Sequence, residues 1–256
     1  MRDSRLKIDI RRNKILDILR KEGKVYVSQL SKILDTSPVT IRNDLASLES
    51  DGHLVRMSGG AVPTNNNTAN LNCSNKGIQN LEEKQAIAHA VSELIKDGDT
   101  LFINSGTTTQ IIAHNLKNKK NLNIVTNSIK VATELGSVPS FKVIILGGEI
   151  NSQYGFTYGG DAQEHLNHFA ADWAILSVDS ISIDGVITTY HAEEAIIDRL
   201  MITRAKQVII PADHSKIGRI GFTFVSGCSN NIRIITNDSS DTLAEMNKKG
   251  ILINSI

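Results

Sequence analysis

Ser37-Pro38-Val39-Thr40-Ile41-Arg42-Asn43-Asp44-Leu45 is the stretch that decides the fold of the first part of this 256-residue chain. Its residues have the pattern of a helix with a sharply defined start. Ser37 is a preferred N-cap residue, and Pro38 follows at the first helical position, where the N–H that proline lacks would have no partner anyway. We expect this helix to end near Asp51-Gly52, because glycine commonly follows the last turn.

The predicted helix has two chemically different faces. An apolar face, which must be buried, is formed by Val39, Ile41, Leu45 and Leu48. The opposite face carries small polar side chains with a basic one beside them: Thr40, Asn43, Ser47 and Arg42. Arginine can bind guanine or a phosphate, and asparagine and threonine can reach base edges in the major groove of DNA. The simpler alternative is that three short helices pack together and that this face only meets water.

The segments on either side complete a helix-turn-helix plan with a small wing. An earlier amphipathic helix ends at Gly23, and a second, short helix follows with Ser28 as its expected N-cap. A tight turn then leads into the helix described above. Two extended pieces in residues 53–62 flank Ser58-Gly59-Gly60 and predict a hairpin. We therefore assign residues 1–63 to a winged helix-turn-helix domain.

The composition changes after residue 63. Residues 64–80 are rich in Asn, Ser and Thr, which is typical of a linker. From residue 81 to 256, helical stripes alternate with short β-branched runs, at 100–103, 123–126, 143–146, 173–176, 208–211 and 232–235. Such runs predict a mostly parallel sheet with helices on both faces. The expected fold is α/β: a small winged helix-turn-helix domain followed by a larger, doubly wound domain.

Polar residues follow several of the predicted strands. Asn104-Ser105-Gly106-Thr107-Thr108-Thr109 comes after the strand at 100–103 and precedes a helix expected over 110–116. Thr126-Asn127-Ser128 and Gly147-Gly148-Glu149 each close a strand, and Asp213-His214-Ser215-Lys216 follows the strand at 208–211. Ligands of open α/β sheets lie beyond the carboxyl ends of the strands, and exposed N–H groups there suit an anion. Taken singly, these stretches are also compatible with an ordinary N-cap and with plain loops.

Charge and composition narrow the classes of function. Residues 1–60 contain 12 Lys and Arg against 8 Asp and Glu, which leaves 16 against 19 in the remainder, so the first part carries +4 and the rest −3. A basic head on a slightly acidic body is typical of a chain that binds nucleic acid at one end. Cys73 and Cys228 lack metal-ligand spacing, so we expect reduced thiols, no metal and no cofactor. No apolar run approaches the ~20 residues of a membrane span, and no signal core follows Met1, so a cytoplasmic protein is expected.

Residues 11–62 resemble the DeoR-type winged helix-turn-helix. The matching positions are Arg11-Arg12, Ser37, Thr40-Ile41-Arg42, Asp44-Leu45, Leu48-Glu49, Gly52, Arg56 and Gly59-Gly60-Ala61. With the polar helix face, the resemblance implies a set of DNA-contacting residues: Arg11, Arg12, Ser28, Ser37, Val39, Thr40, Arg42, Asn43, Ser47, Arg56, Gly59 and Gly60. The family commonly has a second arginine where this chain has Asn43, so the family's operator preferences are not carried over.

Residues 81–238 resemble the DeoR-type sensor domain, which is similar to ribose-5-phosphate isomerase. The resemblance implies that the loop from Ser105 to Thr109 binds a phosphate and that Asp179, Glu194 and Lys216 face a sugar. The full set of expected ligand-binding residues is Asn104, Ser105, Gly106, Thr107, Thr108, Thr109, Asn127, Gly147, Gly148, Asp179, Glu194 and Lys216. Two positions depart from the family, which usually has Asp in place of Asn104 and Lys in place of Asp198. A carboxylate at 198 would favour an amino sugar.

Three functions compete for this combination of domains. The first is a repressor of a carbohydrate-utilisation operon that binds double-stranded operator DNA as a dimer or tetramer and is released by a phosphorylated sugar or amino sugar. The second is an isomerase-like enzyme with a fused DNA module, in which Asp179, Glu194 and Lys216 would exchange protons with the substrate. The third is a DNA-binding scaffold with a degenerate pocket. We expect the first, with no catalytic residues, because the histidines show no catalytic spacing.

Overall fold

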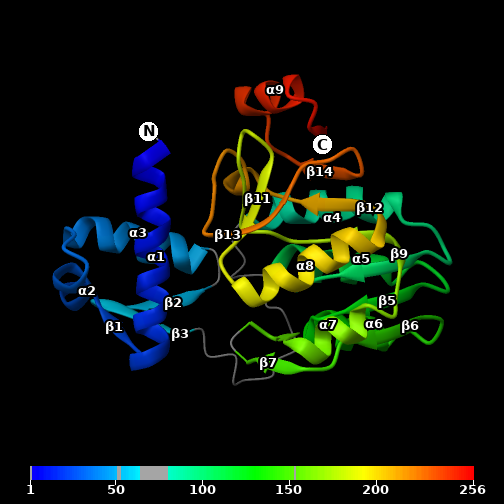
Figure 1. Ribbon diagram of the computed structural model, residues 1–256, viewed down its shortest axis with the longest axis horizontal. Helices are drawn as coiled ribbons and strands as arrows, with labels where there is room; N and C mark the ends of the chain where they lie inside the picture. The colour runs from blue at the N-terminus through cyan, green and yellow to red at the C-terminus, as the bar shows by residue number, and fades with distance from the viewer. Residues whose placement is uncertain (1, 51–52, 64–79, 153) are drawn as a thin grey trace. The chain divides into compact units, whose positions relative to one another are not determined.

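The computed structural model describes residues 2–50, 53–63, 80–152 and 154–256 (Figure 1). The chain divides into two compact units, residues 1–79 and 80–256, which are described separately. Nearly all of the predicted linker, residues 64–79, lies outside the described residues, as does Cys73. No helix in the described part of the chain is long and apolar enough to cross a membrane.

The first unit is a winged helix-turn-helix. Its elements in chain order are α1 (Arg2–Glu22), β1 (Val25–Tyr26), α2 (Val27–Ile33), α3 (Pro38–Ser50), β2 (Leu54–Met57) and β3 (Gly60–Pro63). β3 is the middle strand of the antiparallel sheet, between β1 and β2. The predicted hairpin is confirmed: Met57 pairs with Gly60 across the two-residue turn Ser58-Gly59, and Gly59 has the left-handed φ of +80° that glycine adopts without strain.

Two sequence expectations for this unit were wrong. α2 begins at Val27, so Ser28 lies inside the first turn and does not cap the helix. Val39 does not join the inward face of α3, because its side chain is 62% exposed whereas Ile41, Leu45 and Leu48 are buried. Val39 stands two positions before Ile41, which is about 200° around a helix of 3.6 residues per turn. The apolar side chain of Val39 suggested that this residue is buried. Its position in the helical period, however, determines that it lies on the exposed face.

The second unit is built on a parallel sheet of seven strands. The strands are β4 (Thr100–Ile103), β5 (Asn123–Thr126), β6 (Lys142–Ile145), β9 (Ala171–Ile175), β12 (Ala205–Pro211), β14 (Ile232–Thr236) and β15 (Leu252–Ser255). Their order across the sheet is β15-β14-β12-β9-β4-β5-β6, and every neighbouring pair is parallel. The chain thus starts in the middle of the sheet, builds outward to β6 and returns to continue from β9 in the other direction. The predicted doubly wound α/β fold is confirmed.

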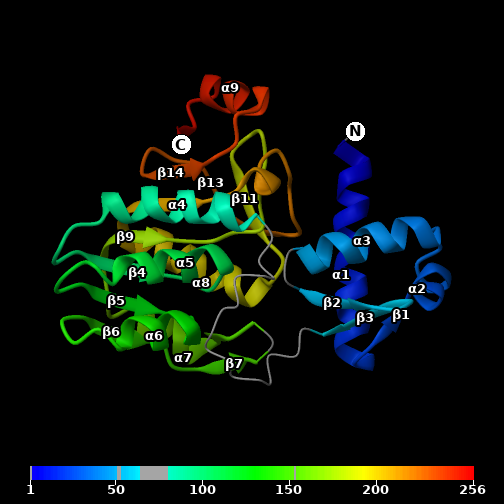
Figure 2. The ribbon, with the colours of Figure 1, turned by 180° about the vertical axis from the view of Figure 1, so that it is seen from behind.

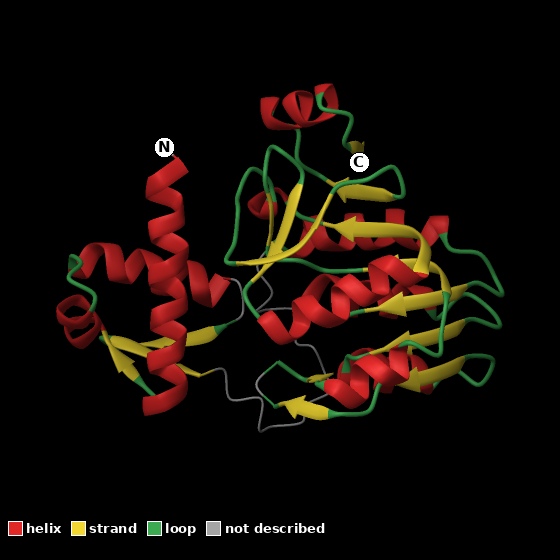
Figure 3. Cartoon of the chain, viewed as in Figure 1, coloured by secondary structure: helices red, strands yellow, loops and turns green. Residues whose placement is uncertain are grey.

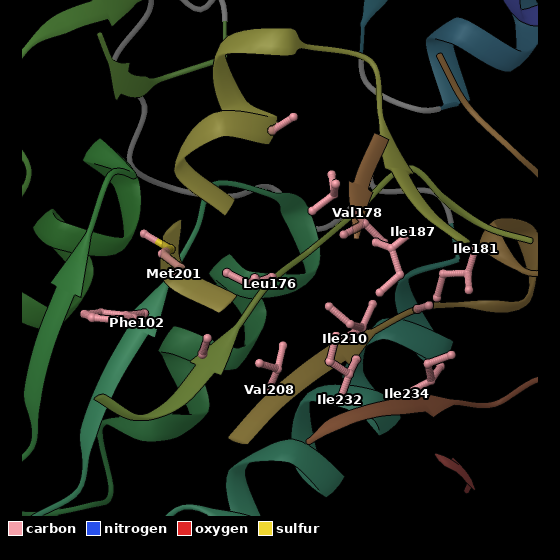
Figure 4. Packing of buried hydrophobic residues seen from close by; sticks show 14 of the residues in the cluster. Phe102, Leu176, Val178, Ile181, Ile187, Met201, Val208, Ile210, Ile232 and Ile234 are labelled. Carbon is pink, nitrogen blue, oxygen red and sulfur yellow. The ribbon is translucent and has the colours of Figure 1, made fainter. Parts of the chain in front are cut away.

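Helices cover both faces of this sheet (Figures 1 and 2). On one face lie α4 (Leu81–Leu94), α5 (Thr107–Leu116) and α6 (Ile129–Gly136). On the other lie α7 (Gly160–Leu166) and α8 (Ala192–Arg204), and α9 (Asp241–Lys248) adds buried side chains to the same core. The labelled residues of Figure 4, such as Phe102, Leu176 and Ile210, belong to this second core, in which each fully buried apolar side chain stabilises the fold by about 1.5–3 kcal/mol.

Short antiparallel strands lie outside the main sheet (Figure 3). A hairpin is formed by β7 (Glu149–Asn151) and β8 (Phe156–Tyr158), and a three-stranded sheet by β10 (Ser180–Ile181), β11 (Val186–Thr189) and β13 (Thr223–Gly227). The sequence patterns described above predict strands at neither of these places. They also predict a helix that starts at residue 110, whereas α5 begins at Thr107, because the three threonines form its first turn.

Candidate functional sites

The outward face of α3 carries the residues expected to meet DNA. Arg42 and Asn43 are exposed, whereas Thr40 and Ser47 are half-buried. Ser37 caps the helix as predicted: its hydroxyl accepts a hydrogen bond of 3.1 Å from the backbone N–H of Thr40. A basic and an amide side chain thus project from the first turns of a capped helix, next to the exposed Val39. Such a surface can present donors and one apolar group to base edges.

Arg11 and Arg12 both bind Asp44 instead of facing solvent freely. The Nε of Arg11 lies 2.5 Å from Asp44 Oδ2, and the Nε of Arg12 lies 3.2 Å from Asp44 Oδ1. The Asp44 side chain is only 3% exposed, and the two guanidinium groups are largely covered. A buried carboxylate shared by two arginines ties α1 to the middle of α3. Arg11 and Arg12 therefore stabilise the packing of α3 against α1.

The wing is tied to the end of α3 in a similar way. Arg56 on β2 donates to Glu49 through its backbone N–H, at 2.7 Å, and through its Nε, at 2.6 Å. Burial works to raise the pKa of Glu49, but these hydrogen bonds and the charge of Arg56 outweigh it and leave the pKa below its ordinary value. The turn at Ser58-Gly59 and the side chain of Ser28 are exposed.

In the second unit the expected ligand residues gather at the carboxyl end of the sheet, around the point where the strand order reverses. That point lies between β4 and β9, and the loops after these two strands lead to opposite faces of the sheet. Doubly wound folds bind their ligands in the crevice at this place. Asn104 follows β4 directly and is fully buried.

Asn104 bridges the two strand ends. Its Nδ2 donates to the backbone carbonyl of Ser177 at 2.9 Å, and the backbone N–H of Ser177 donates to its Oδ1 at 2.8 Å. The Nδ2 also donates to Asp198 Oδ1 on α8, at 3.0 Å. The two positions that depart from the usual DeoR pattern, Asn104 and Asp198, are therefore hydrogen-bonded to each other although 94 positions separate them.

The loop after Asn104 and the first turn of α5 form the expected phosphate site. Thr107 is exposed at the start of the helix, Ser105 is nearly buried, and Thr108 and Thr109 are buried within the first turn. Gly106 is required by a close approach: a Cβ atom there would stand 2.5 Å from the Cβ of Ser177. The start of α5 is therefore seated directly on the loop after β9. The N–H groups and the dipole at the start of a helix suit an anion.

A chain of acidic side chains runs from the end of β9 to α8. Asp179 Oδ2 accepts hydrogen bonds from the Thr189 hydroxyl, at 2.9 Å, and from the Tyr190 N–H, at 2.8 Å. The Thr189 hydroxyl also lies 3.2 Å from Glu194 Oε2. A hydroxyl has one proton, so it can make a full hydrogen bond with both carboxyls only if one of them is protonated and donates to it. The second oxygen of Asp198 has no hydrogen-bond partner within the described residues.

Burial keeps protons on this group of carboxyls. It raises the pKa of Glu194 well above the ordinary value, and the neighbouring carboxylates of Asp198 and Asp179 raise it further. Burial likewise raises the pKa of Asp198 to about 7, although the hydrogen bond from Asn104 works in the opposite direction. Near neutral pH this edge of the sheet therefore holds a carboxyl group, that of Asp198, which takes up or releases a proton.

Lys216 reaches the same place from η2 (His214–Lys216), the short 3-10 helix after β12. Its Nζ lies 3.8 Å from Asp179 Oδ1, and both side chains are largely covered. Asp213 points the other way, toward the start of α4: Asn80 donates to its Oδ1 at 3.1 Å, and Lys84 Nζ lies 3.5 Å from its Oδ2. The loop after β12 thus contacts both the acidic group and the first residues of the sensor unit.

Glu83, Asp213 and His214 are close enough together to hold a metal ion. The contacts of Asp213 argue against one. The ammonium group of Lys84 lies beside one of its oxygens, and Asn80 and the N–H of Ser215 donate to the other. His214 Nδ1 lies 2.7 Å from Glu83 Oε2, and this contact raises the pKa of the imidazole.

The remaining expected residues lie farther along the same edge. Asn127 is fully buried and donates to the Thr157 carbonyl at 3.3 Å, so it holds the β7–β8 hairpin. Gly147 and Gly148 are exposed between β6 and this hairpin. The hairpin loop reaches over the phosphate site, because the Ser105 hydroxyl lies 3.4 Å from the Tyr154 carbonyl and the Tyr154 ring lies 4.4 Å from that of His191.

Sequence reasoning missed two residues that organise this site. Ser177 contributes only backbone groups to Asn104, and nothing in its side chain signals that role. Thr189 joins Asp179 to Glu194, and its position just before α8 was a usable signal, because a hydroxyl at the end of a strand beside an acidic helix start commonly serves as a hydrogen-bonding partner.

A hollow also occurs at the opposite edge of the sheet, near the amino ends of β4, β9 and β12. Its lining includes Asp172, Arg204 and Lys206, and the Lys206 ammonium group pairs with Asp172 Oδ1 at 2.8 Å. Open α/β sheets bind ligands at the other edge, so the polar group around Asn104 is the better candidate site.

Comparisons with known proteins match each of the two units to a domain family. Residues 11–67 match the DeoR-like helix-turn-helix domain, and residues 79–238 match the DeoR C terminal sensor domain. The glycerol-3-phosphate regulon repressor of Escherichia coli (strain K12) is 35% identical over 209 residues, which are 82% of each chain. The putative aga operon transcriptional repressor of Escherichia coli O157:H7 is 32% identical over 245 residues, which are 94% of this chain and 91% of that one.

Solved structures overlap with about half of the chain. Ribose 5-phosphate isomerase from Plasmodium falciparum covers 53% of this chain with 52% of its own, at 16% identity and a TM-score of 0.39. The two domain matches together span residues 11–67 and 79–238, and the relatives are similar over most of their length. The chain belongs to the DeoR family of transcriptional regulators.

Proposed function

We propose that the chain is a DNA-binding repressor of a carbohydrate-utilisation operon and that a phosphorylated sugar or amino sugar releases it from DNA. The observation that carries the proposal is the exposed polar face of α3, where Arg42 and Asn43 project beside a capped helix start. Relatives named as repressors of the glycerol-3-phosphate regulon and of the aga operon support it.

On the DNA side, α3 enters the major groove. Arg42 and Asn43 contact base edges, and Thr40 and Ser47 complete this surface. Val39, being exposed and apolar, suits a thymine methyl group. Ser37, Ser28, Arg56 and Gly59 contact the sugar-phosphate backbone. Gly60, which is buried in β3, supports the turn. Arg11 and Arg12 act indirectly, because their guanidinium groups are engaged with Asp44.

On the effector side, the phosphate binds at the start of α5, where Ser105 to Thr109 offer N–H and hydroxyl donors. The sugar lies toward Asp179, Glu194 and Lys216, with Gly147-Gly148 at the rim. The buried Asn127 supports the β7–β8 hairpin beside it. Two heads of a dimer or tetramer bind spaced half-sites. An effector that prefers another arrangement of the heads lowers DNA affinity by the difference between its two binding free energies.

An isomerase is the second candidate, because carboxyl groups with raised pKa values are what proton transfer between sugar carbons requires. A panel of glucose 6-phosphate, glucosamine 6-phosphate, fructose 6-phosphate, ribose 5-phosphate and glycerol 3-phosphate separates the possibilities. We expect a thermal shift without product formation. Product formation would favour the enzyme, and no shift with any of them would favour a scaffold.

The DNA assignment is tested by Arg42→Ala. We expect operator binding in a gel shift to weaken by about fivefold or more, because a bidentate arginine contact is worth about 1–3 kcal/mol. Lys130→Ala removes one exposed positive charge from α6 and serves as the matched control. Unchanged operator binding by Arg42→Ala would exclude α3 as the recognition helix.

The phosphate assignment is tested by Thr107→Ala. We expect weaker effector binding by calorimetry with DNA binding of the effector-free protein retained, since a donor is lost at the start of α5. Thr133→Ala on α6 is the control, because it removes an exposed helical threonine outside the site. Normal release from DNA by effector in Thr107→Ala would contradict the phosphate site.

A further inference from the structure

We propose that Asn104 and Asp198 are positioning residues for the effector: the Asn104 amide joins the phosphate-binding start of α5 to the end of β9, and Asp198 supports the orientation of that amide by accepting a hydrogen bond from it. This inference rests on the proposed effector site. It assigns a function to a pair of side chains that are themselves too deeply buried to form the exposed surface of that site.

The geometry shows how Asn104 fastens the two strand ends. Its backbone N–H donates to the Ile175 carbonyl at 3.3 Å, and its side-chain amide then exchanges two hydrogen bonds with the backbone of Ser177. The side chain thereby imitates one more residue of the β4–β9 ladder. These hydrogen bonds extend the β4–β9 ladder at the carboxyl end of the sheet, beside the crevice in which doubly wound folds bind their ligands.

Only asparagine can make this set of contacts. Asn104 uses both N–H donors of its amide, toward Ser177 and Asp198, and one of its two acceptor positions, toward the Ser177 N–H. An aspartate there would bring acceptor against acceptor at two of the three contacts. Asp198 in turn can only accept when ionised, so it requires the NH2 side of the amide to face α8 and the oxygen to face the Ser177 N–H.

The hydrogen bonds of Asn104 with Ser177 and Asp198, called the clasp from here on, fix the position of the phosphate site. Two residues after Asn104, the Cβ that Gly106 lacks would overlap the Ser177 side chain, so the loop has no room to move toward β9. Asp179 lies two residues after Ser177 and faces Lys216. Asn104 and Ser177 therefore set the distance between the phosphate end of the site, at Thr107, and the sugar end, at Asp179.

The experiment uses four full-length variants, titrated with inorganic phosphate by calorimetry at pH 8: Asn104→Ala, Asn104→Asp, Asp198→Asn and the double variant Asn104→Asp/Asp198→Asn. We expect Asp198→Asn to bind phosphate within about threefold of wild type, because its amide oxygen can still accept from Asn104. Asn104→Ala and Asn104→Asp should bind at least about tenfold more weakly. The double variant should recover part of the loss, since the amide of Asp198→Asn can donate to the new carboxylate and restores one of the two contacts that Asn104→Asp loses.

Two comparisons distinguish an effect of positioning on phosphate affinity from effects of charge and of stability. Asn104→Ala changes no charge, so its weaker binding cannot come from repulsion of the anion. Ile232→Val is a conservative change of a buried residue on β14. It lowers the free energy of unfolding by about 0.5–1.5 kcal/mol and should leave phosphate affinity unchanged. At pH 6 the defect of Asn104→Asp should shrink, because a proton shared between its two facing carboxyls replaces a lost donor.

Two results would overturn the inference. Phosphate affinity of Asn104→Ala within twofold of wild type would show that the clasp does not position the site. A double variant no better than Asn104→Asp would show that the two residues do not act as a pair. Failure of the wild-type chain to bind phosphate at all would instead contradict the proposed effector site, and this inference with it.

Discussion

The carboxyl group of Asp198 has consequences for the pH dependence of stability. Burial raises its pKa to about 7, whereas the unfolded chain has the ordinary value of 3.8. Between these values the folded state holds a proton that the unfolded state has lost, so the free energy of unfolding falls as pH rises from about 4 to about 7. The loss for one proton amounts to at most about 1.4 kcal/mol per pH unit.

We therefore expect Asp198→Asn to flatten this part of the stability curve, measured by urea denaturation at several pH values. Glu194 shifts in the same direction and remains in the variant, so part of the slope persists. Glu134→Gln is a suitable control, because the pKa of Glu134 is lowered by its contacts with Lys117 and His114, and removing it should not flatten the curve. Parallel curves for wild type and Asp198→Asn would show that Asp198 does not titrate in this range.

Individual residues of the site could be predicted from sequence to different degrees. Asn104 and the threonines after it were found, because a polar run directly after a β-branched strand lies at the ligand edge of a parallel sheet. The hydrogen bond between Asn104 and Asp198 could not be found, because it joins positions 94 residues apart, and the order of strands and helices alone brings them together. The resemblance marked both positions as unusual without showing that they touch.

At the scale of elements, α3 is held by residues that differ from those proposed to contact DNA. We expect Arg11→Ala to lower the free energy of unfolding of the first unit by about 1–3 kcal/mol, since it leaves the buried Asp44 carboxylate with one guanidinium partner fewer. Arg42→Ala should leave stability unchanged, because its side chain is exposed. Hydrogen exchange of α3 amides in the full chain, together with gel shifts, checks both.

Arg11→Ala and Arg42→Ala should therefore differ in the hydrogen exchange of α3. Arg11→Ala raises exchange in α3 and weakens DNA binding, whereas Arg42→Ala weakens DNA binding alone. If Arg11→Ala lost DNA binding with unchanged exchange, Arg11 would be a direct phosphate contact, as the family resemblance alone suggested.

Elements were predictable where one local signal dominates. The runs of β-branched residues located all but the last of the parallel strands, and the Ser37-Pro38 signature located the start of α3. β15 was missed, because its polar positions interrupt the apolar run at the end of the chain. The start of α5 was placed three residues late, because threonine has a weak helix propensity and the first turn is stabilised by its position after β4.

At the scale of the whole molecule, the order of the strands decides where the sensor site lies, and sequence patterns do not specify that order. Parallel strands with similar apolar runs can be arranged in many ways. The observed order puts the first and fourth parallel strands side by side, so that the loops at Asn104 and Asp179 meet. The same order brings the loop after β12 against the start of α4, immediately after residues 64–79.

We propose that this contact carries the effect of the proposed effector from its site to the beginning of the second unit at Asn80. Lys216 meets the acidic group at one end of η2, while Asp213 binds Asn80 and Lys84 at the other. An effector that draws Lys216 away from Asp179 changes the support of Asn80, where the sensor unit begins. We expect Lys84→Met, which keeps the length of the side chain and removes its charge, to leave effector affinity within about threefold of wild type.

The same variant should lose regulation. The ratio of DNA dissociation constants with and without the sugar phosphate that shifts the wild type most should move toward 1, because coupling between two sites requires a contact that differs between the two states. Fluorescence anisotropy with labelled operator measures this ratio. Lys96→Met makes the same change at an exposed lysine just after α4 and should leave the ratio at its wild-type value. A wild-type ratio in Lys84→Met would exclude this route and leave the effector to act through another contact of the sensor unit.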